Sequence, residues 1–107
     1  MKKKYFNWKK KTSILIGRFQ PFHEGHYQLF LNGLKNSGQV AILIMDSYNI
    51  NKKNPFKFQE VKNKINERLK KYKYQYIIIK IPVTREIIYG RKVGYKITKI
   101  NLPNKIQ

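Results

Sequence analysis

The chain has 107 residues, with 24 Lys and Arg against 5 Asp and Glu, and its formal net charge is +19. That length predicts a single domain, and a hydrophobic content of 41% is ordinary for a globular protein and excludes wholesale disorder. The absence of cysteine excludes a disulfide framework, a cysteine-based zinc site and a cysteine nucleophile. Apolar runs such as residues 77–79 are too short to cross a membrane. The charge predicts attraction to anions, among them nucleotides, nucleic acids and anionic lipids.

The first 11 residues carry six lysines interleaved with Tyr5, Phe6 and Trp8. We expect residues 1–11 to form a solvated basic tail with one or two aromatic rings resting on the domain. The alternative is a grip on single-stranded nucleic acid. The apolar stretch that follows is too short for a signal peptide, so the default expectation is a cytoplasmic protein.

The next elements alternate between strand and helix. A short apolar run at residues 13–16, ended by Gly17, predicts a buried strand. Helical spacing of apolar residues predicts a helix over residues 26–35, with Gly38 as its stop. The uninterrupted apolar run at residues 39–45 predicts a second strand, of the kind found in parallel sheets.

A polar loop over residues 46–55 leads to a second amphipathic helix at residues 58–72, where Val61, Ile65 and Leu69 share one face. A third strand is expected at residues 76–81, and a half-exposed fourth at residues 95–102. This order predicts an α/β fold for residues 12–107, with right-handed crossovers and a small, mainly parallel sheet between two helical layers. In such three-layer, Rossmann-like sheets, ligands bind beyond the carboxyl ends of the strands, which directs attention to the loops there.

The loop after the first strand, residues 17–26, reads GRFQPFHEGH and holds both histidines of the chain, His23 and His26. Their spacing places both on one side of the first helical turn. Imidazole N–H groups, free backbone N–H groups at the helix start and Arg18 then converge, which predicts a phosphate site. Gly17 would allow backbone to approach a ligand, and Gly25 would leave room above the turn. A metal site is the alternative, but there is no third His or any Cys, and carboxylates are scarce.

This motif resembles the H-x-G-H signature of the nucleotidyltransferase superfamily, also called cytidylyltransferase-like, and most nearly its nicotinamide mononucleotide adenylyltransferase type. Residues 54–56 (NPF) and 88–91 (IYGR) are similar to further stretches of these proteins. The resemblance covers about residues 12–106. It implies transfer of a nucleoside monophosphate from ATP, CTP or another triphosphate to a small phosphate monoester, with Mg²⁺ accompanying the triphosphate and pyrophosphate leaving.

The resemblance also implies roles for individual residues. His23 and His26 would be the catalytic pair that holds the α-phosphate. The nucleotide and phosphate cleft would be lined by Gly17, Arg18, Phe19 and Gly25.

The chain departs from the family pattern after its last expected strand. The family has a later motif, roughly Ile-Ser-Ser/Ala-Thr-x-x-Arg, that holds the β- and γ-phosphates, whereas this sequence ends at residues 103–107 (PNKIQ). Arg91, Lys92 and Arg85 are the candidates that would replace this clamp electrostatically, and the alternative for Arg91 is a solvated surface arginine. The rival hypotheses are an inactive module that binds nucleotide or nucleic acid through its charge, and a structural protein that completes its sheet in a homo-oligomer.

Three residues in the second loop region are candidates for binding the acceptor: Asp46, Asn54 and Phe56. For Asp46, which ends the second strand, the sequence favours the alternative of an exposed carboxylate at a turn. Asn54 and Phe56 are equally consistent with capping and stapling the second helix.

Overall fold

The computed structural model describes residues 5–46, 50, 55–90, 97 and 100 of the chain. Its elements are β1 (Ser13–Gly17), α1 (Glu24–Ser37), β2 (Val40–Met45), α2 (Phe58–Arg68), a 3-10 helix η1 (Lys70–Tyr72) and β3 (Tyr76–Ile81). Three of the four expected strands and both expected helices are thus confirmed, and the second helix divides at Leu69 into α2 and η1. No helix among these residues has the length and hydropathy needed to cross a membrane.

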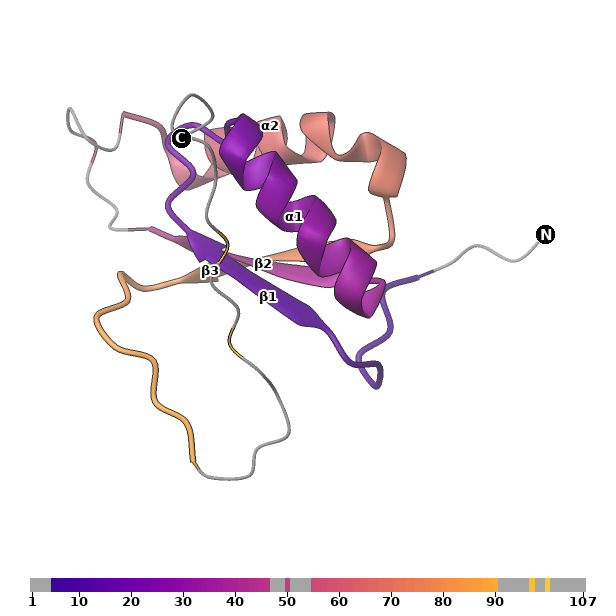
Figure 1. The fold of residues 1–107 in the computed structure, drawn as a ribbon. Helices are drawn as coiled ribbons and strands as arrows, with labels where there is room; N and C mark the ends of the chain where they lie inside the picture. The colour runs from indigo at the N-terminus through magenta and orange to yellow at the C-terminus, as the bar shows by residue number, and fades with distance from the viewer. Residues whose placement is uncertain (1–4, 47–49, 51–54, 91–96, 98–99, 101–107) are drawn as a thin grey trace.

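The three strands form one parallel sheet in the order β1-β2-β3, which confirms the α/β class (Figure 1). Both connections step across the sheet in the same direction. Because such crossovers are right-handed, they bring α1 and α2 to the same face of the sheet. β2, in the centre, carries the most thoroughly buried residues of the three strands.

The core lies between that face and the two helices. Ile42 in β2, Phe30 in α1 and Ile65 in α2 each have no exposed surface. The apolar positions predicted for the second helix are confirmed as its buried face, since Val61, Ile65 and Leu69 all join the core. The full cluster of buried residues comprises Phe19, Phe30, Val40, Ile42, Ile44, Val61, Ile65 and Leu69.

The opposite face of the sheet carries neither α1 nor α2. Ile14 of β1 lies on it and is 63% exposed. A second helical layer, as expected for a three-layer fold, is not found among the described residues. The expected fourth strand at residues 95–102 falls almost wholly outside them, and its two described positions, Ile97 and Ile100, are not in a strand.

The segment before β1 is attached to the domain through Gln39, which is 3% exposed. The Gln39 side chain accepts from the Asn7 N–H (3.1 Å) and donates to the Asn7 carbonyl (2.8 Å) and to Thr12 Oγ1 (2.7 Å). The Tyr5 ring meets Tyr74 edge-on, with centroids 5.0 Å apart. One buried amide therefore satisfies the backbone of an otherwise exposed entry to the sheet.

A pair of matched substitutions tests this assignment of faces. Ile42→Ala removes buried methyl groups from the core and should lower the free energy of unfolding by about 2–5 kcal/mol. Ile14→Ala makes the same chemical change on the uncovered face and should cost less than about 1 kcal/mol. Urea denaturation of both variants gives the comparison, and equal losses would contradict the placement of the core.

Candidate functional site

The carboxyl ends of the three strands meet at one edge of the sheet. In the strand register Gly17 lies opposite Ile44, and Met45 lies opposite Ile81. The Asp46 N–H donates to the Ile81 carbonyl at 3.0 Å, so β2 and β3 remain joined where they end. The loop after β1 leads from this edge directly into α1, which places the predicted phosphate motif there (Figure 1).

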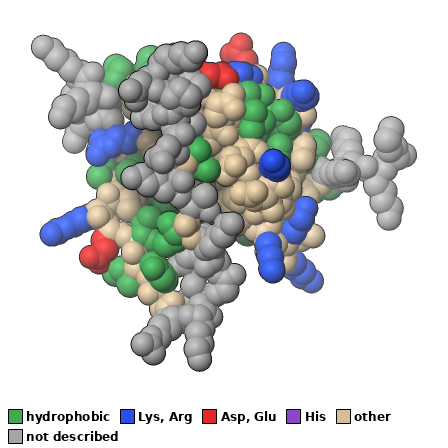
Figure 2. All heavy atoms as spheres, in the orientation of Figure 1, with side chains coloured by type: hydrophobic (Ala, Val, Ile, Leu, Met, Phe, Trp, Pro, Cys, Tyr) green, Lys and Arg blue, Asp and Glu red, His purple; other side chains and the backbone are tan. Residues whose placement is uncertain are grey.

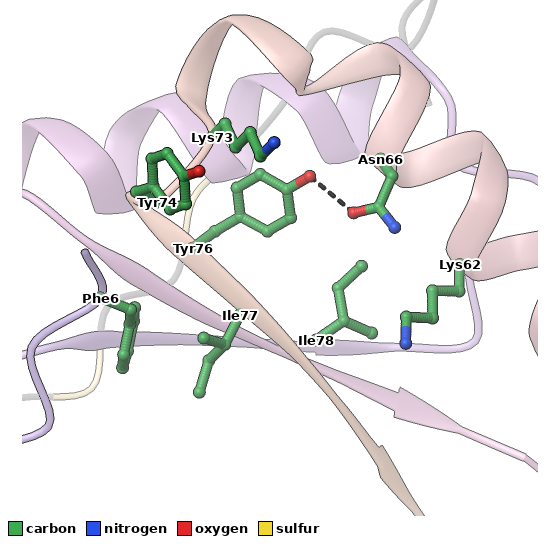
Figure 3. A pocket seen from close by; sticks show the side chains of 8 residues that line it. All are labelled: Phe6, Lys62, Asn66, Lys73, Tyr74, Tyr76, Ile77 and Ile78. Carbon is green, nitrogen blue, oxygen red and sulfur yellow. Dashed lines mark hydrogen bonds between the residues drawn. The ribbon is translucent and has the colours of Figure 1, made fainter. Parts of the chain in front are cut away.

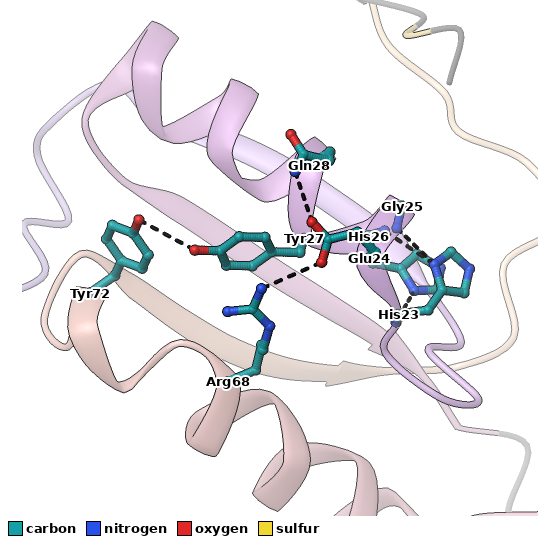
Figure 4. Close-up of polar contacts among 8 residues, drawn as sticks. All are labelled: His23, Glu24, Gly25, His26, Tyr27, Gln28, Arg68 and Tyr72. Carbon is teal, nitrogen blue, oxygen red and sulfur yellow. Dashed lines mark hydrogen bonds and ion pairs between the residues drawn. The ribbon is translucent and has the colours of Figure 1, made fainter. Parts of the chain in front are cut away.

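His23 and His26 cap the N-terminus of α1 reciprocally (Figure 4). Nδ1 of His23, the N-cap residue, accepts from the backbone N–H groups of Gly25 (3.0 Å) and His26 (3.4 Å). Nδ1 of His26 accepts from the backbone N–H of His23 at 3.1 Å. The two rings stack, with centroids 3.7 Å apart and planes 18° from parallel. The sequence spacing predicted the shared side of the helix, and the structure confirms it.

This cap determines the tautomer of both imidazoles. A nitrogen that accepts a hydrogen bond carries no proton, so in the neutral form of each ring the proton lies on Nε2. Burial, and then the neighbouring His23, lower the pKa of His26 from 6.5 to about 4. His26 is therefore a neutral hydrogen-bond donor at physiological pH, and its Nε2–H is the group available to an external ligand.

The capping bonds also correct one expectation. The sequence suggested that free backbone N–H groups at the helix start would face a phosphate. Instead, the N–H groups of His23, Gly25 and His26 are donated to the two imidazoles. The side chains thus take up backbone donors and present Nε2–H donors in their place.

The Phe19 ring packs against the ring of His26, and Gly17 leaves the space that the Phe19 ring occupies. The Phe19 ring is 2% exposed and meets the His26 ring edge-on at 4.8 Å. A Cβ on Gly17 would lie 2.9 Å from Phe19 Cε1, so the glycine is needed to admit that ring. Phe19 has a φ of 54°, a left-handed conformation that costs a non-glycine residue energy. The Phe19 ring therefore belongs to the core, and the place predicted for this residue in the nucleotide and phosphate cleft stays a prediction.

Gln20, which the sequence analysis did not single out, joins the first loop to the second. Its Nε2 donates to the Phe56 carbonyl (3.0 Å) and its Oε1 accepts from the Phe56 N–H (2.8 Å). Phe56 precedes Lys57, the N-cap of α2, and its ring packs against the core with Lys64 Nζ 4.1 Å above it. These contacts match the alternative in which Phe56 staples the helix. No local pattern could reveal a bond between residues 36 positions apart.

The remaining predicted residues are spread around this edge. Arg18 is exposed directly after β1. Asp46 is half-buried, 3.9 Å from Lys80 Nζ, at the end of β2. Asn54 and Arg91 lie outside the described residues. Within the part of the chain that the structure describes, no three His, Cys, Asp or Glu side chains gather as a metal site would require.

A depression lies at the amino end of the sheet, beside the start of β3 (Figure 3). It has a volume of about 370 Å³, and the Tyr76 hydroxyl donates to Asn66 Oδ1 within it at 2.7 Å. Its lining residues are Phe6, Lys62, Asn66, Lys73, Tyr74, Tyr76, Ile77 and Ile78. Because it adjoins the amino end of β3, it is separate from the histidine site.

Comparison with known proteins agrees with this geometry. A family model described as cytidylyltransferase-like matches residues 14–79, more than half of the chain. The chain belongs to the cytidylyltransferase-like family. The match spans β1 to β3 and so includes the histidine cap and Gln20.

Individual relatives place this member nearest to the adenylyltransferases. The chain is 36% identical over 75 residues to a nicotinamide-nucleotide adenylyltransferase of Thermoplasma acidophilum, covering 68% of this chain and 42% of that protein. It also resembles a bifunctional NMN adenylyltransferase/ADP ribose pyrophosphatase of Francisella tularensis, with a TM-score of 0.62 and 36% identity. That structure was solved with AMP and a manganese ion, and the likeness covers 68% of this chain and 23% of the relative. A second structure of the same bifunctional protein matches equally well, with 22% of it covered. The chain thus spans less than half the length of the relatives it matches.

The lowered pKa of His26 gives stability a pH dependence. Unfolding returns this pKa to its usual 6.5, so between pH 6.5 and about 4 the unfolded chain binds more protons than the folded one. The contribution of His26 to the free energy of unfolding is therefore fully present above pH 6.5 and is lost as the pH falls toward about 4. Urea denaturation across this range should show a steeper fall for the wild type than for His26→Gln, which has no titrating ring. Identical pH profiles would contradict the neutral, partly buried imidazole.

Proposed function

We propose that this chain binds a nucleoside triphosphate at the carboxyl edge of its sheet and transfers the nucleoside monophosphate to a phosphate monoester. In this reaction an acceptor phosphate oxygen bonds to the α-phosphorus as the bond from that phosphorus to the bridging oxygen breaks, and pyrophosphate leaves. The observation that carries the proposal is the stacked pair His23–His26, whose Nδ1 atoms are engaged by backbone and whose Nε2–H donors remain for the ligand.

In this proposal His23 and His26 donate hydrogen bonds to oxygens of the α-phosphate. Negative charge shifts onto these oxygens and the leaving pyrophosphate during the in-line displacement, and fixed donors in a partly dry site stabilise it. A neutral imidazole suits this task, since His26 remains a donor without first having to gain a proton. The positive end of the α1 dipole lies behind both rings and adds to the attraction.

The phosphates further from the reacting centre need cations. Arg18, exposed at the end of β1, is the proposed cation for this role, together with Arg91. Mg²⁺ is proposed to enter as the complex with the triphosphate rather than on a protein site, in keeping with the described acidic residues, which do not gather into one. The manganese ion in the Francisella tularensis structure supports use of a divalent metal in this group.

The relatives favour ATP as the donor and nicotinamide mononucleotide as the acceptor, because both carry adenylyltransferase names for that compound. CTP and other small phosphate monoesters are the alternatives for this chain. The proposed acceptor region remains Asp46, Asn54 and Phe56. The two hydrogen bonds with Gln20 hold the backbone of Phe56 in place there.

The high net charge does not favour a general polyanion binder over this proposal. Figure 2 shows Lys and Arg side chains standing at several separate places around one face, with acidic side chains among them, rather than gathered in one patch. Charge distributed in this way raises the local concentration of any anion without selecting one. Selection then falls to the histidine site.

His23→Asn separates the two roles of His23. Asparagine is a good N-cap, so its amide oxygen can accept from the same backbone N–H groups, but it has no Nε2–H for the phosphate. The variant should fold with nearly unchanged stability and lose about 100- to 1000-fold in pyrophosphate release from ATP in the presence of nicotinamide mononucleotide and Mg²⁺. A coupled pyrophosphate assay measures the rate and urea denaturation measures the stability.

The control is His23→Ala, which should lose both the cap and the activity. Rates for His23→Asn within a factor of about two of an active wild type would overturn the proposed role of the imidazole. A wild-type chain that neither binds ATP nor releases pyrophosphate would overturn the proposed activity itself.

A further inference from the structure

The phosphate motif contains an acidic residue. Glu24 is the first residue of α1 and lies between the two histidines in sequence. Its charge favours the helix, because the N-terminal end of the dipole is positive. The same charge repels an anion bound at the neighbouring histidines. A carboxylate at this position therefore weakens phosphate binding unless a nearby cation compensates its charge.

Two side chains engage the Glu24 carboxylate, Gln28 from α1 and Arg68 from α2 (Figure 4). Gln28 Nε2 donates to Oε1 at 2.9 Å, and Arg68 Nη2 pairs with Oε2 at 3.4 Å. Both carboxylate oxygens are therefore engaged, Oε1 by a side chain of α1 and Oε2 by a side chain of α2. The chain thus supplies a cation to the only acid of its phosphate motif.

The guanidinium of Arg68 is itself held in place. It lies 3.5 Å from the centroid of the Tyr27 ring, and the Tyr27 hydroxyl is 3.4 Å from the Tyr72 hydroxyl. Stacking on an aromatic face suits the planar guanidinium better than an ammonium group. Arg68 is the last residue of α2, so this contact spans from the end of α2 to the first turn of α1.

Folding stability does not account for this arrangement. The Arg68 and Glu24 side chains are 48% and 52% exposed. Ion pairs at such positions contribute little to stability, because water screens them and ordering two long side chains costs entropy. The pair does change the charge next to His23, because Glu24 directly follows His23 at the start of α1.

We propose that Arg68 is a positioning residue for the phosphate site, which holds the Glu24 carboxylate away from the bound anion and compensates its charge. The inference rests on the proposed function, since it concerns the anion that His23 and His26 would bind. It makes the end of α2 an electrostatic part of a site whose donors all lie in α1.

A charge cycle tests the proposal on the full chain, with Mg²⁺-ATP binding measured by calorimetry and pyrophosphate release measured alongside. Arg68→Ala leaves Glu24 uncompensated and should raise the Kd for ATP by about three- to tenfold, with kcat changed less than about twofold. Adding Glu24→Gln to Arg68→Ala should restore the Kd to within about twofold of the wild type. Arg68→Lys should fall between Arg68→Ala and the wild type, because it keeps the charge but not the stacked plane.

Lys70→Ala is the matched control, since it removes one exposed positive charge two residues from Arg68 and should change the Kd by less than about twofold. Equal effects of Lys70→Ala and Arg68→Ala would overturn the proposal, since net charge would then explain both. Failure of Glu24→Gln to rescue Arg68→Ala would also overturn it, because the loss would then be structural. Binding that depends on His23 but not on Arg68 overturns this inference alone, whereas an absence of ATP binding by the wild type overturns the proposed function with it.

Discussion

The imidazole of His23 accepts backbone hydrogen bonds at the start of α1, and the imidazole of His26 accepts one from the backbone N–H of His23. This reciprocal cap satisfies helix donors that would otherwise need water or a ligand. It also fixes the orientation and the tautomer of two rings at once, so the donors of the proposed site are already set by the fold. Preorganised donors of this kind cost no reorganisation during the reaction.

The cap depends in turn on the packing beneath it. Phe19, buried in a left-handed conformation, supports the His26 ring, and only a glycine at position 17 leaves room for it. Gly33 has a similar role further along α1, where an added Cβ would meet Ser13 at 3.1 Å and Val40 at 3.2 Å. The helix therefore lies close against β1 and β2, and the position of the histidines follows from the contact between helix and sheet. A strained loop residue at such a place is consistent with a functional site.

The electrostatics of the molecule act at two ranges. Its +19 net charge draws anions toward the whole surface, with a strength that salt reduces. Selectivity needs short-range groups, which in the proposed site are the two imidazoles, the helix dipole and the compensated Glu24 rather than more lysines. Membership of the cytidylyltransferase-like family and the likeness to adenylyltransferases agree with a site built for one nucleotide rather than for a polymer.

The sequence by itself determined the fold class, three of the strands and both helices, and it predicted the location of the site. Buried strands here are uninterrupted apolar runs, and the buried face of α2 repeats at helical spacing, so local patterns carry that information. The pair His23–His26 was equally visible, because its spacing across one helical turn is a local property. The tertiary structure alone decided which distant segments are in contact. It also decided which acceptor each backbone N–H group at the start of α1 meets.

Gln20 with Phe56, Gln39 with Asn7, and Arg68 with Glu24 join residues more than 30 positions apart, and no local pattern specifies such partners. The role of Phe19 also depended on packing, since a phenylalanine in a loop is compatible with either a ligand or the core until the surrounding residues are placed. Backbone N–H groups at the start of α1 were expected to bind phosphate, but the imidazoles already accept from three of them. That assignment depends on side-chain rotamers, which spacing along a chain does not determine.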